Sequence, residues 1–123
     1  MKKEIEKYQN FLIEKNFSQQ LEELKNIYKD KKILIYGSGF LAQTILKNCD
    51  LSDFNIIGAT DRNFLPETKS FCGYKAYSVF DIPDLNIDII FNFVQNSIDI
   101  ESFLKKHLEK YLSHPIKLIY FFE

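Results

Sequence analysis

The chain has 123 residues, of which 46% are hydrophobic and 27% charged, and its formal net charge is −1. This length favours one domain, and this composition is typical of a folded chain rather than a disordered one. The nearly neutral charge gives no electrostatic reason to expect a nucleic acid or a membrane surface as a partner.

The sequence also lacks the marks of export. No apolar stretch approaches the ~20 residues that a membrane-spanning helix needs, and the charged N-terminal stretch has no apolar segment of the signal-peptide kind. Cys49 and Cys72 lie far apart, without a C-x-x-C motif or a paired histidine, so we expect two reduced thiols. These features predict a cytoplasmic protein with no membrane span.

Apolar residues recur at spacings of three and four over residues 2–30, which predicts two helices at about 2–15 and 18–30. Ser18 is a suitable N-cap for the second helix. The pair forms an N-terminal helical extension, residues 1–31. Its apolar stripe either packs on the rest of the fold or forms a seam for dimerisation or for docking a partner.

The remainder, residues 32–123, alternates between predicted strands and helices. Five apolar or alternating segments predict strands, at residues 33–36, 54–59, 73–77, 88–94 and 116–122. The predicted helices run from after Gly39 to about Asn48, over one turn capped by Ser78 and ended by Pro83, and from a cap at Asn96 or Ser97 to about Ser113. Residues 62–72 are polar and predicted to be irregular. Such alternation predicts an α/β fold with a parallel sheet of about five strands, order 3-2-1-4-5, and flanking helices.

A G-x-G-x-x-A motif follows the first predicted strand and opens the next helix. Gly37 allows a tight turn, Gly39 lets a phosphate approach the backbone, and Ala42 keeps the helix close to the sheet. Asp61 ends the second predicted strand, 22 residues beyond Gly39, near the ~20 expected of an acid that accepts hydrogen bonds from ribose hydroxyls. This arrangement is typical of a Rossmann-like nucleotide-binding domain. Phe40, at the start of the helix, either covers the phosphate site or lines it.

Other polar residues follow the strands toward the same crevice. Arg62, the only arginine, is either a ligand for a ribose phosphate or a solvated loop charge. Because Asp61 would repel that phosphate, the pair favours a free ribose diol, and hence NAD or a nucleoside diphosphate over NADP. Asn92 lies inside an apolar strand and needs a hydrogen-bond partner. Asn96 either contacts a ligand or caps the next helix.

The sequence contains no recognisable catalytic or metal-binding constellation. His107 lies on the apolar side of the last predicted helix, which indicates a core or boundary residue, and His114 precedes Pro115 as a predicted cap at the helix end. No Ser/His/Asp, Cys/His or metal-ligand arrangement is visible. Catalytic residues are therefore unknown, and no metal site is predicted.

From about residue 32 to 122 the chain resembles small Rossmann-like domains of bacterial sugar and cell-surface polysaccharide enzymes. The resemblance rests on I-L-I-Y-G-S-G-F-L-A, N-I-I-G-A-T-D-R-N, G-Y-K-A-Y-S and I-D-I-I-F-N-F-V. Such domains precede the catalytic part of sugar acyltransferases and follow that of sugar C-methyltransferases. The resemblance implies a nucleotide-sugar site that includes Gly37, Ser38, Gly39 and Asp61. The catalytic parts of those enzymes are missing from this sequence, so catalysis is not implied.

Three functional hypotheses remain. The first is a nucleotide or nucleotide-sugar binding module in bacterial surface-glycan biosynthesis, with Gly37, Ser38, Gly39, Phe40, Asp61, Arg62 and Asn96 as binding residues and a homodimer or partner enzyme expected. The second is the NAD-binding half of an oxidoreductase that is active only as an oligomer or complex. The third is an oligomerisation domain without a ligand, in which the apolar last strand at the sheet edge is covered by the N-terminal helices or by another chain.

Overall fold

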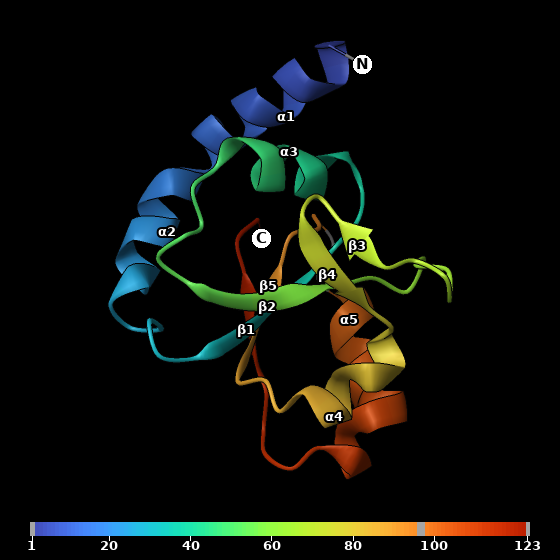
Figure 1. Cartoon of the computed structure of the whole chain (residues 1–123). Helices are drawn as coiled ribbons and strands as arrows, with labels where there is room; N and C mark the ends of the chain where they lie inside the picture. Colours follow the sequence, from blue (N-terminus) through green and yellow to red (C-terminus); the bar gives the residue numbers. More distant parts are fainter. Residues whose placement is uncertain (1, 96–97, 123) are drawn as a thin grey trace.

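The computed structural model describes residues 2–95 and 98–122. Its centre is one six-stranded sheet with the strand order β3-β4-β2-β1-β5-β6, and all neighbours are parallel except the β3–β4 pair (Figure 1). The strands are β1 (Lys32–Tyr36), β2 (Asn55–Thr60), β3 (Ser70–Phe71), β4 (Tyr74–Tyr77), β5 (Ile89–Asn92) and β6 (Lys117–Tyr120). The predicted α/β class with a mostly parallel sheet is confirmed.

The sheet differs from the predicted one by its additional strand. β3 lies in the stretch that was predicted to be irregular, and it pairs antiparallel with β4 at the edge of the sheet. The connection is a two-residue turn in which Cys72 and Gly73 both have positive φ, 48° and 85°. Hairpins of this kind usually carry Asn or Asp before the glycine. Because Cys72 stands there instead, the sequence did not predict the turn.

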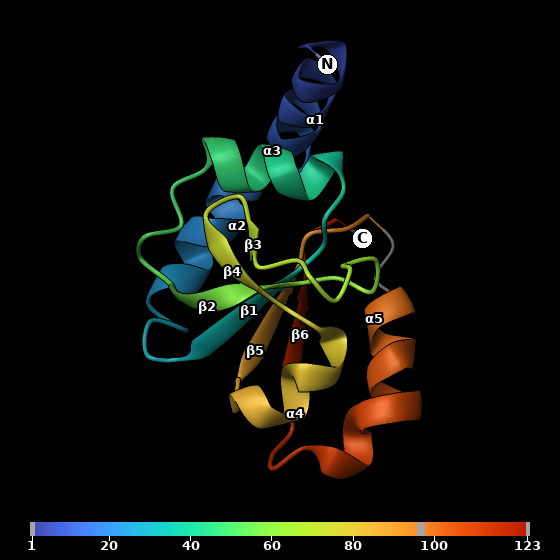
Figure 2. The same cartoon turned by 45° about the vertical axis from the view of Figure 1, so that its right-hand side comes forward.

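Helices cover both faces of the sheet. α1 (Lys2–Glu14), α2 (Phe17–Lys25) and α3 (Phe40–Asn48) lie on one side, and α4 (Ile82–Leu85) and α5 (Ile98–Phe103) lie on the other (Figure 2). Short turns of other helix types complete the second layer: η1 (Val79–Asp81), the π-helical η2 (Leu104–Leu108) and η3 (Glu109–Tyr111). None of the helices within 2–95 and 98–122 is long and apolar enough to cross a membrane.

Successive strand residues point to opposite faces, so the sheet builds two cores. On the face of α1–α3, Ile33, Ile35 and Phe91 pack with residues of the N-terminal helices and with Phe121. On the other face, Leu34 and Ile90 pack with residues of α4, α5 and η2. Both cores require the central strands to be apolar on both sides, as β1 and β5 are.

The N-terminal helices share the first core with the sheet. Leu12, Phe17 and Leu21 are buried there, and the ring of Phe17 stacks on that of Phe122, with centroids 5.6 Å apart. The amide of Gln20 also donates to the carbonyl of Phe121 at 3.0 Å. One apolar stripe of the extension therefore packs on the fold, as the first of the two alternatives expected.

Several predicted helix ends differ from the structure. α2 begins at Phe17, and its N-cap is Asn16 in a left-handed conformation, so Ser18 is not the cap. Ser78 does cap η1, in a reciprocal capping box with Asp81. Pro83 does not end this segment, because it lies in the first turn of α4, where the missing N–H costs nothing. The chain leaves α4 at Asn86, which has φ 54°.

The last helical segment ends at Tyr111 rather than near Ser113, and it is not uniformly α-helical. It changes from α5 to the π-helical η2 and then to the 3₁₀ turn η3. Its predicted caps, Asn96 and Ser97, lie outside the described residues.

Candidate functional site

The turn after β1 requires a glycine at position 37. Gly37 has φ 136°, a conformation that side chains other than glycine rarely adopt. A Cβ on Gly37 would lie 3.1 Å from the carbonyl oxygen of Phe93 and 3.2 Å from Cγ1 of Val94. The N–H of Gly37 donates to the carbonyl of Thr60 at 3.1 Å. Gly37 therefore shapes the turn, and its own N–H is already used within the fold.

Gly39 differs from Gly37 in its backbone conformation and in the space around its Cβ position. It is the N-cap of α3 with φ −79° and ψ −173°, an extended conformation open to any residue, and no side chain caps this helix end. A Cβ on Gly39 would meet no atom within 4 Å. Because the first N–H groups of a helix have no partner within it, this end of α3 presents unpaired donors beside open space. Phe40 follows as the first helical residue and is 48% exposed.

Asp61 lies beside this turn, at the end of the neighbouring strand. Tyr36 of β1 pairs with Thr60 of β2, so Gly37 and Asp61 are the next residues at the same edge of the sheet. Asp61 is only 7% exposed, and its Oδ1 accepts the backbone N–H of Asn63 at 2.8 Å. This local bond orients the carboxylate. The structure thus places Gly37 and Asp61 after neighbouring strands at one edge of the sheet, with Gly39 two residues further along the chain.

Arg62 turns toward α5. Its guanidinium forms an ion pair with Asp99 and lies over the ring of Phe103, 5.4 Å from the centroid. The Tyr36 hydroxyl donates to the other oxygen of Asp99 at 2.9 Å. Neither alternative for Arg62 anticipated this partner, because Asp99 is distant in sequence.

Tyr36 is the most strongly perturbed titratable group of this region. Burial raises the pKa of Tyr36 well above its usual range, and the hydrogen bond to Asp99 and the nearby charge of Asp61 raise it further. Each effect disfavours a phenolate. Tyr36 therefore remains a neutral hydrogen-bond donor over the physiological pH range.

Asn92 ends β5, on the other side of β1. It pairs in register with Tyr36 and is 1% exposed. Neither Nδ2 nor Oδ1 of its side chain has a hydrogen-bond partner. The expected partner of this buried amide is thus missing from the described fold. The other polar residue predicted here, Asn96, lies outside the described residues.

A cavity of about 650 Å³ adjoins Asp61. The sequence did not predict this cavity. It lies between the loop after β2, the end of β4 and η1, and its lining combines aromatic and basic side chains. These include Phe64, Lys69, Lys75 and Tyr77. The Lys75 ammonium lies 5.0 Å from the centre of the Tyr77 ring. Phe64 follows Asp61 closely in the chain, while the pairing of β4 with β2, which sets Tyr77 beside Thr60, brings Lys75 and Tyr77 to the same place.

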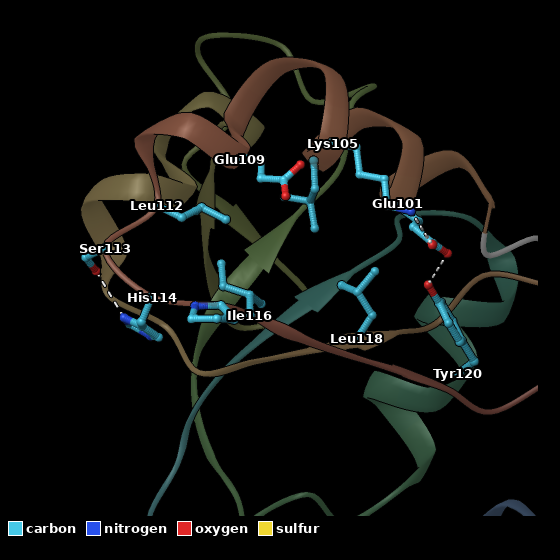
Figure 3. A pocket seen from close by; sticks show the side chains of 11 residues that line it. Glu101, Lys105, Glu109, Leu112, Ser113, His114, Ile116, Leu118 and Tyr120 are labelled. Carbon is cyan, nitrogen blue, oxygen red and sulfur yellow. Dashed lines mark hydrogen bonds and ion pairs between the residues drawn. The ribbon is translucent and has the colours of Figure 1, made fainter.

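A second cavity of about 650 Å³ lies between β6 and the last helical segment (Figure 3). Glu101 of α5 accepts the Tyr120 hydroxyl at 2.9 Å and pairs with Lys105 at 3.2 Å at one end of this cavity. These two contacts lower the pKa of Glu101 below its usual value. Among the described residues, none of those predicted to bind a ligand lines this second cavity.

Both histidines have structural surroundings that the sequence did not predict. His107 is exposed rather than buried, and its ring lies against that of Phe103, with centroids 4.9 Å apart. The helical segment changes to π geometry here, which rotates His107 away from the core face that α-helical periodicity predicted. His114 contacts the carbonyl oxygen of Ile87 at 2.7 Å and so links the chain before β6 to the start of β5.

Within residues 2–95 and 98–122, no group of three or more His, Cys, Asp or Glu residues could hold a metal ion. Comparison of the chain with protein-family models, with curated proteins and with solved structures finds no match in any of the three. The residues at the carboxyl edge of the sheet are therefore the feature of this chain that points to a function.

Proposed function

We propose that this chain is a nucleotide or nucleotide-sugar binding module of the Rossmann-like kind. The single observation that carries the proposal is that the start of α3 at Gly39 and the carboxylate of Asp61 follow two neighbouring strands at the same edge of the sheet. The uncapped, open start of α3 offers backbone donors for a phosphate, and a buried carboxylate stands on the adjacent strand. Phosphate at a helix N-terminus and ribose on an acid after the second strand are the contacts that this arrangement supports.

The topology supports the same crevice. β1 lies between β2 and β5, and the chain continues outward from β1 in both directions. Open parallel sheets bind ligands at such a switch point, outside the carboxyl ends of the strands. The cavity beside Asp61 has an aromatic and basic lining, which suits the base of a nucleotide whose ribose is bound at Asp61.

We extend the proposal to bacterial surface-glycan biosynthesis because residues 32–122 resemble the nucleotide-sugar domains of enzymes in such pathways. In this role the module holds its ligand for a partner enzyme or for a second copy of the chain. Its contribution is positional: phosphate on the backbone at Gly39, and ribose on Asp61.

A thermal-shift panel tests this function, using UDP- and GDP-sugars, NAD, NADP, S-adenosylmethionine and coenzyme A. A ligand at about 100 times its dissociation constant stabilises the folded state by about 2.7 kcal/mol, which is several degrees for a chain of this size. We expect one class of nucleotide-sugar to raise the melting temperature. A rise with NAD alone would select the oxidoreductase hypothesis, and a flat panel at millimolar ligand would contradict nucleotide binding.

Gly39→Val is the matched variant for this panel. Its backbone angles and the open space at Cβ predict normal folding, while the added side chain occupies the approach to the helix start. We expect a folded protein with a slightly lower melting temperature without ligand, because valine is a poorer N-cap than glycine, and no shift with ligand. Ser52→Val, on an exposed turn, is the control and should keep the full shift.

A further inference from the structure

Asn92 is the one residue whose buried side-chain polar atoms lack hydrogen-bond partners in the part of the chain that the structure describes. Its side chain is almost completely buried, with 1% exposed. An amide that is removed from water without a partner costs free energy, because it loses the hydrogen bonds that water made to it. An apolar residue at this position would avoid the cost. The presence of an amide therefore indicates a role that an apolar side chain could not fill.

The surroundings of Asn92 form a defined box. In register, Asn92 stands between Tyr36 of β1 and Tyr120 of β6, and the three side chains share the α5 face. The Tyr36 hydroxyl donates to Asp99 and the Tyr120 hydroxyl donates to Glu101, both at 2.9 Å. We call these five residues the Asn92 box. It consists of the Asn92 amide, the tyrosines on either side of it, and the carboxylates of Asp99 and Glu101 on α5.

The box adjoins the glycine turn. The N–H of Phe93, the residue after Asn92, donates to the carbonyl of Tyr36 at 2.9 Å. The carbonyl oxygen of Phe93 is also the atom closest to the position of a Cβ on Gly37. The box and the glycine turn therefore lie next to each other at the carboxyl edge of the sheet.

The chemistry of the box selects a neutral group rich in hydroxyls. An amide supplies donors and an acceptor side by side, and two carboxylates supply further acceptors for O–H donors. Arg62 pairs with Asp99 and Lys105 pairs with Glu101, so the charges of the two carboxylates are already balanced and the box offers no net charge to an ionic group. The carboxylates are already accessible, since the side chains of Asp99 and Glu101 are 47% and 45% exposed.

We propose that the Asn92 box binds the sugar of a nucleotide-sugar, with the Asn92 amide hydrogen-bonding to neighbouring sugar hydroxyls. This inference rests on the proposed function and names the part of the ligand that Asn92 recognises. Because a carboxylate accepts several hydrogen bonds, ligand hydroxyls donate to Asp99 and Glu101 beside the tyrosine hydroxyls. The sugar then supplies the partners that the buried amide lacks.

Calorimetric titrations of the whole chain with UDP, UDP-glucose, GDP and GDP-mannose test this proposal. The variant is Asn92→Leu, which is nearly isosteric, with Asn92→Val as a second apolar replacement suited to a strand. The control is Asn55→Leu, which makes the same change at an exposed strand residue. Melting temperatures without ligand are measured for all four proteins.

We expect the wild type to bind a nucleotide-sugar about tenfold or more tightly than its nucleoside diphosphate, the ratio that corresponds to about one hydrogen bond. Both Asn92 variants should bind the diphosphate normally, lose the preference for the sugar form, and melt at a higher temperature without ligand. Asn55→Leu should keep the preference.

Three results would overturn the proposal. The preference could survive in an Asn92 variant, or the wild type could bind both ligand forms equally while still binding nucleotides. Both Asn92 variants could instead melt lower than wild type, which would assign the amide to an internal water and to stability. Failure of the wild type to bind any of the four ligands is a different result, and it would overturn the proposed function itself.

Discussion

The two faces of the sheet are built from the same strands but differ in the side chains that they bury. The α1–α3 face is a continuous apolar core that contains six buried phenylalanines, at positions 17, 54, 91, 93, 121 and 122. The α4–α5 face is mostly aliphatic, and at the carboxyl edge it ends in the polar row of Tyr36, Asn92 and Tyr120. The comparison indicates that one face supplies most of the stability, which leaves the other free to carry costly polar groups.

The largest effect should come from the aromatic core. Phe17→Ala removes a ring that is 1% exposed and lies within 6 Å of the rings of Phe93, Phe121 and Phe122. We expect a loss of about 3–5 kcal/mol in the free energy of unfolding, measured by urea denaturation. Phe80→Ala, on the opposite face at 63% exposure, should cost well under half of that. Equal losses would contradict the burial of Phe17 in the aromatic core as the source of the effect.

A smaller effect is expected at the polar row. Tyr36→Phe removes the hydrogen bond to the Asp99 carboxylate and should cost about 1–3 kcal/mol at neutral pH. Because burial raises the pKa of Tyr36 in the folded state, its contribution is complete below the ordinary tyrosine pKa near 10. As pH rises above that value, the unfolded chain loses the proton first and stability falls.

The pH dependence provides the decisive measurement for Tyr36. Unfolding free energies between pH 8 and about 11 should fall more steeply for the wild type than for Tyr36→Phe. Tyr111→Phe, at an exposed tyrosine, is the control and should follow the wild-type curve. Parallel curves for wild type and Tyr36→Phe would show that Tyr36 ionises alike in the folded and unfolded states.

The smallest effect on stability is expected on the outer side of α1, which tests the alternative that this helix docks a partner. Ile13 is 74% exposed and Ile5 is 42% exposed, while Leu12 and Phe17 belong to the core. Ile13→Asp should change the unfolding free energy by less than about 0.5 kcal/mol. If α1 forms a seam between copies, the same change should convert a dimer to a monomer in sedimentation experiments.

An unchanged oligomeric state in Ile13→Asp would argue against such a seam. Deletion of the N-terminal helices is a poor test of the same idea, because it would remove Leu12, Phe17 and Leu21 from the core as well. The point substitution separates docking from folding.

Much of the fold was predictable from local signals. The apolar runs of β1 and β5, the G-x-G turn and the periodicity of α3 placed the parallel strands and the helix that starts at Phe40. The strand β3 was missed because its turn depends on Cys72 at positive φ, an unusual residue for this conformation. The π-helical turn that exposes His107 was missed because sequence periodicity assumes a regular helix.

The candidate site was predictable only in part. Gly37, Gly39 and Asp61 could be chosen because a turn, a helix start and a strand end each have local residue requirements. The partner of Arg62 and the cavity beside Asp61 depend on contacts between segments that are remote in sequence. Asn92 was recognised as a residue that needs a partner, but its isolation could not be foreseen from a single strand.

The sequence by itself therefore determined the alternation of strands and helices and the need for glycine after β1, because backbone conformation and hydrophobic periodicity are local properties. Tertiary structure alone decided which polar groups found partners. The register of β1, β5 and β6 places Asn92 between Tyr36 and Tyr120. Because α5 packs over this row, the two tyrosine hydroxyls donate to Asp99 and Glu101. Hydrogen bonding of a buried group depends on neighbours from other strands and helices, and only the packed chain brings those neighbours together.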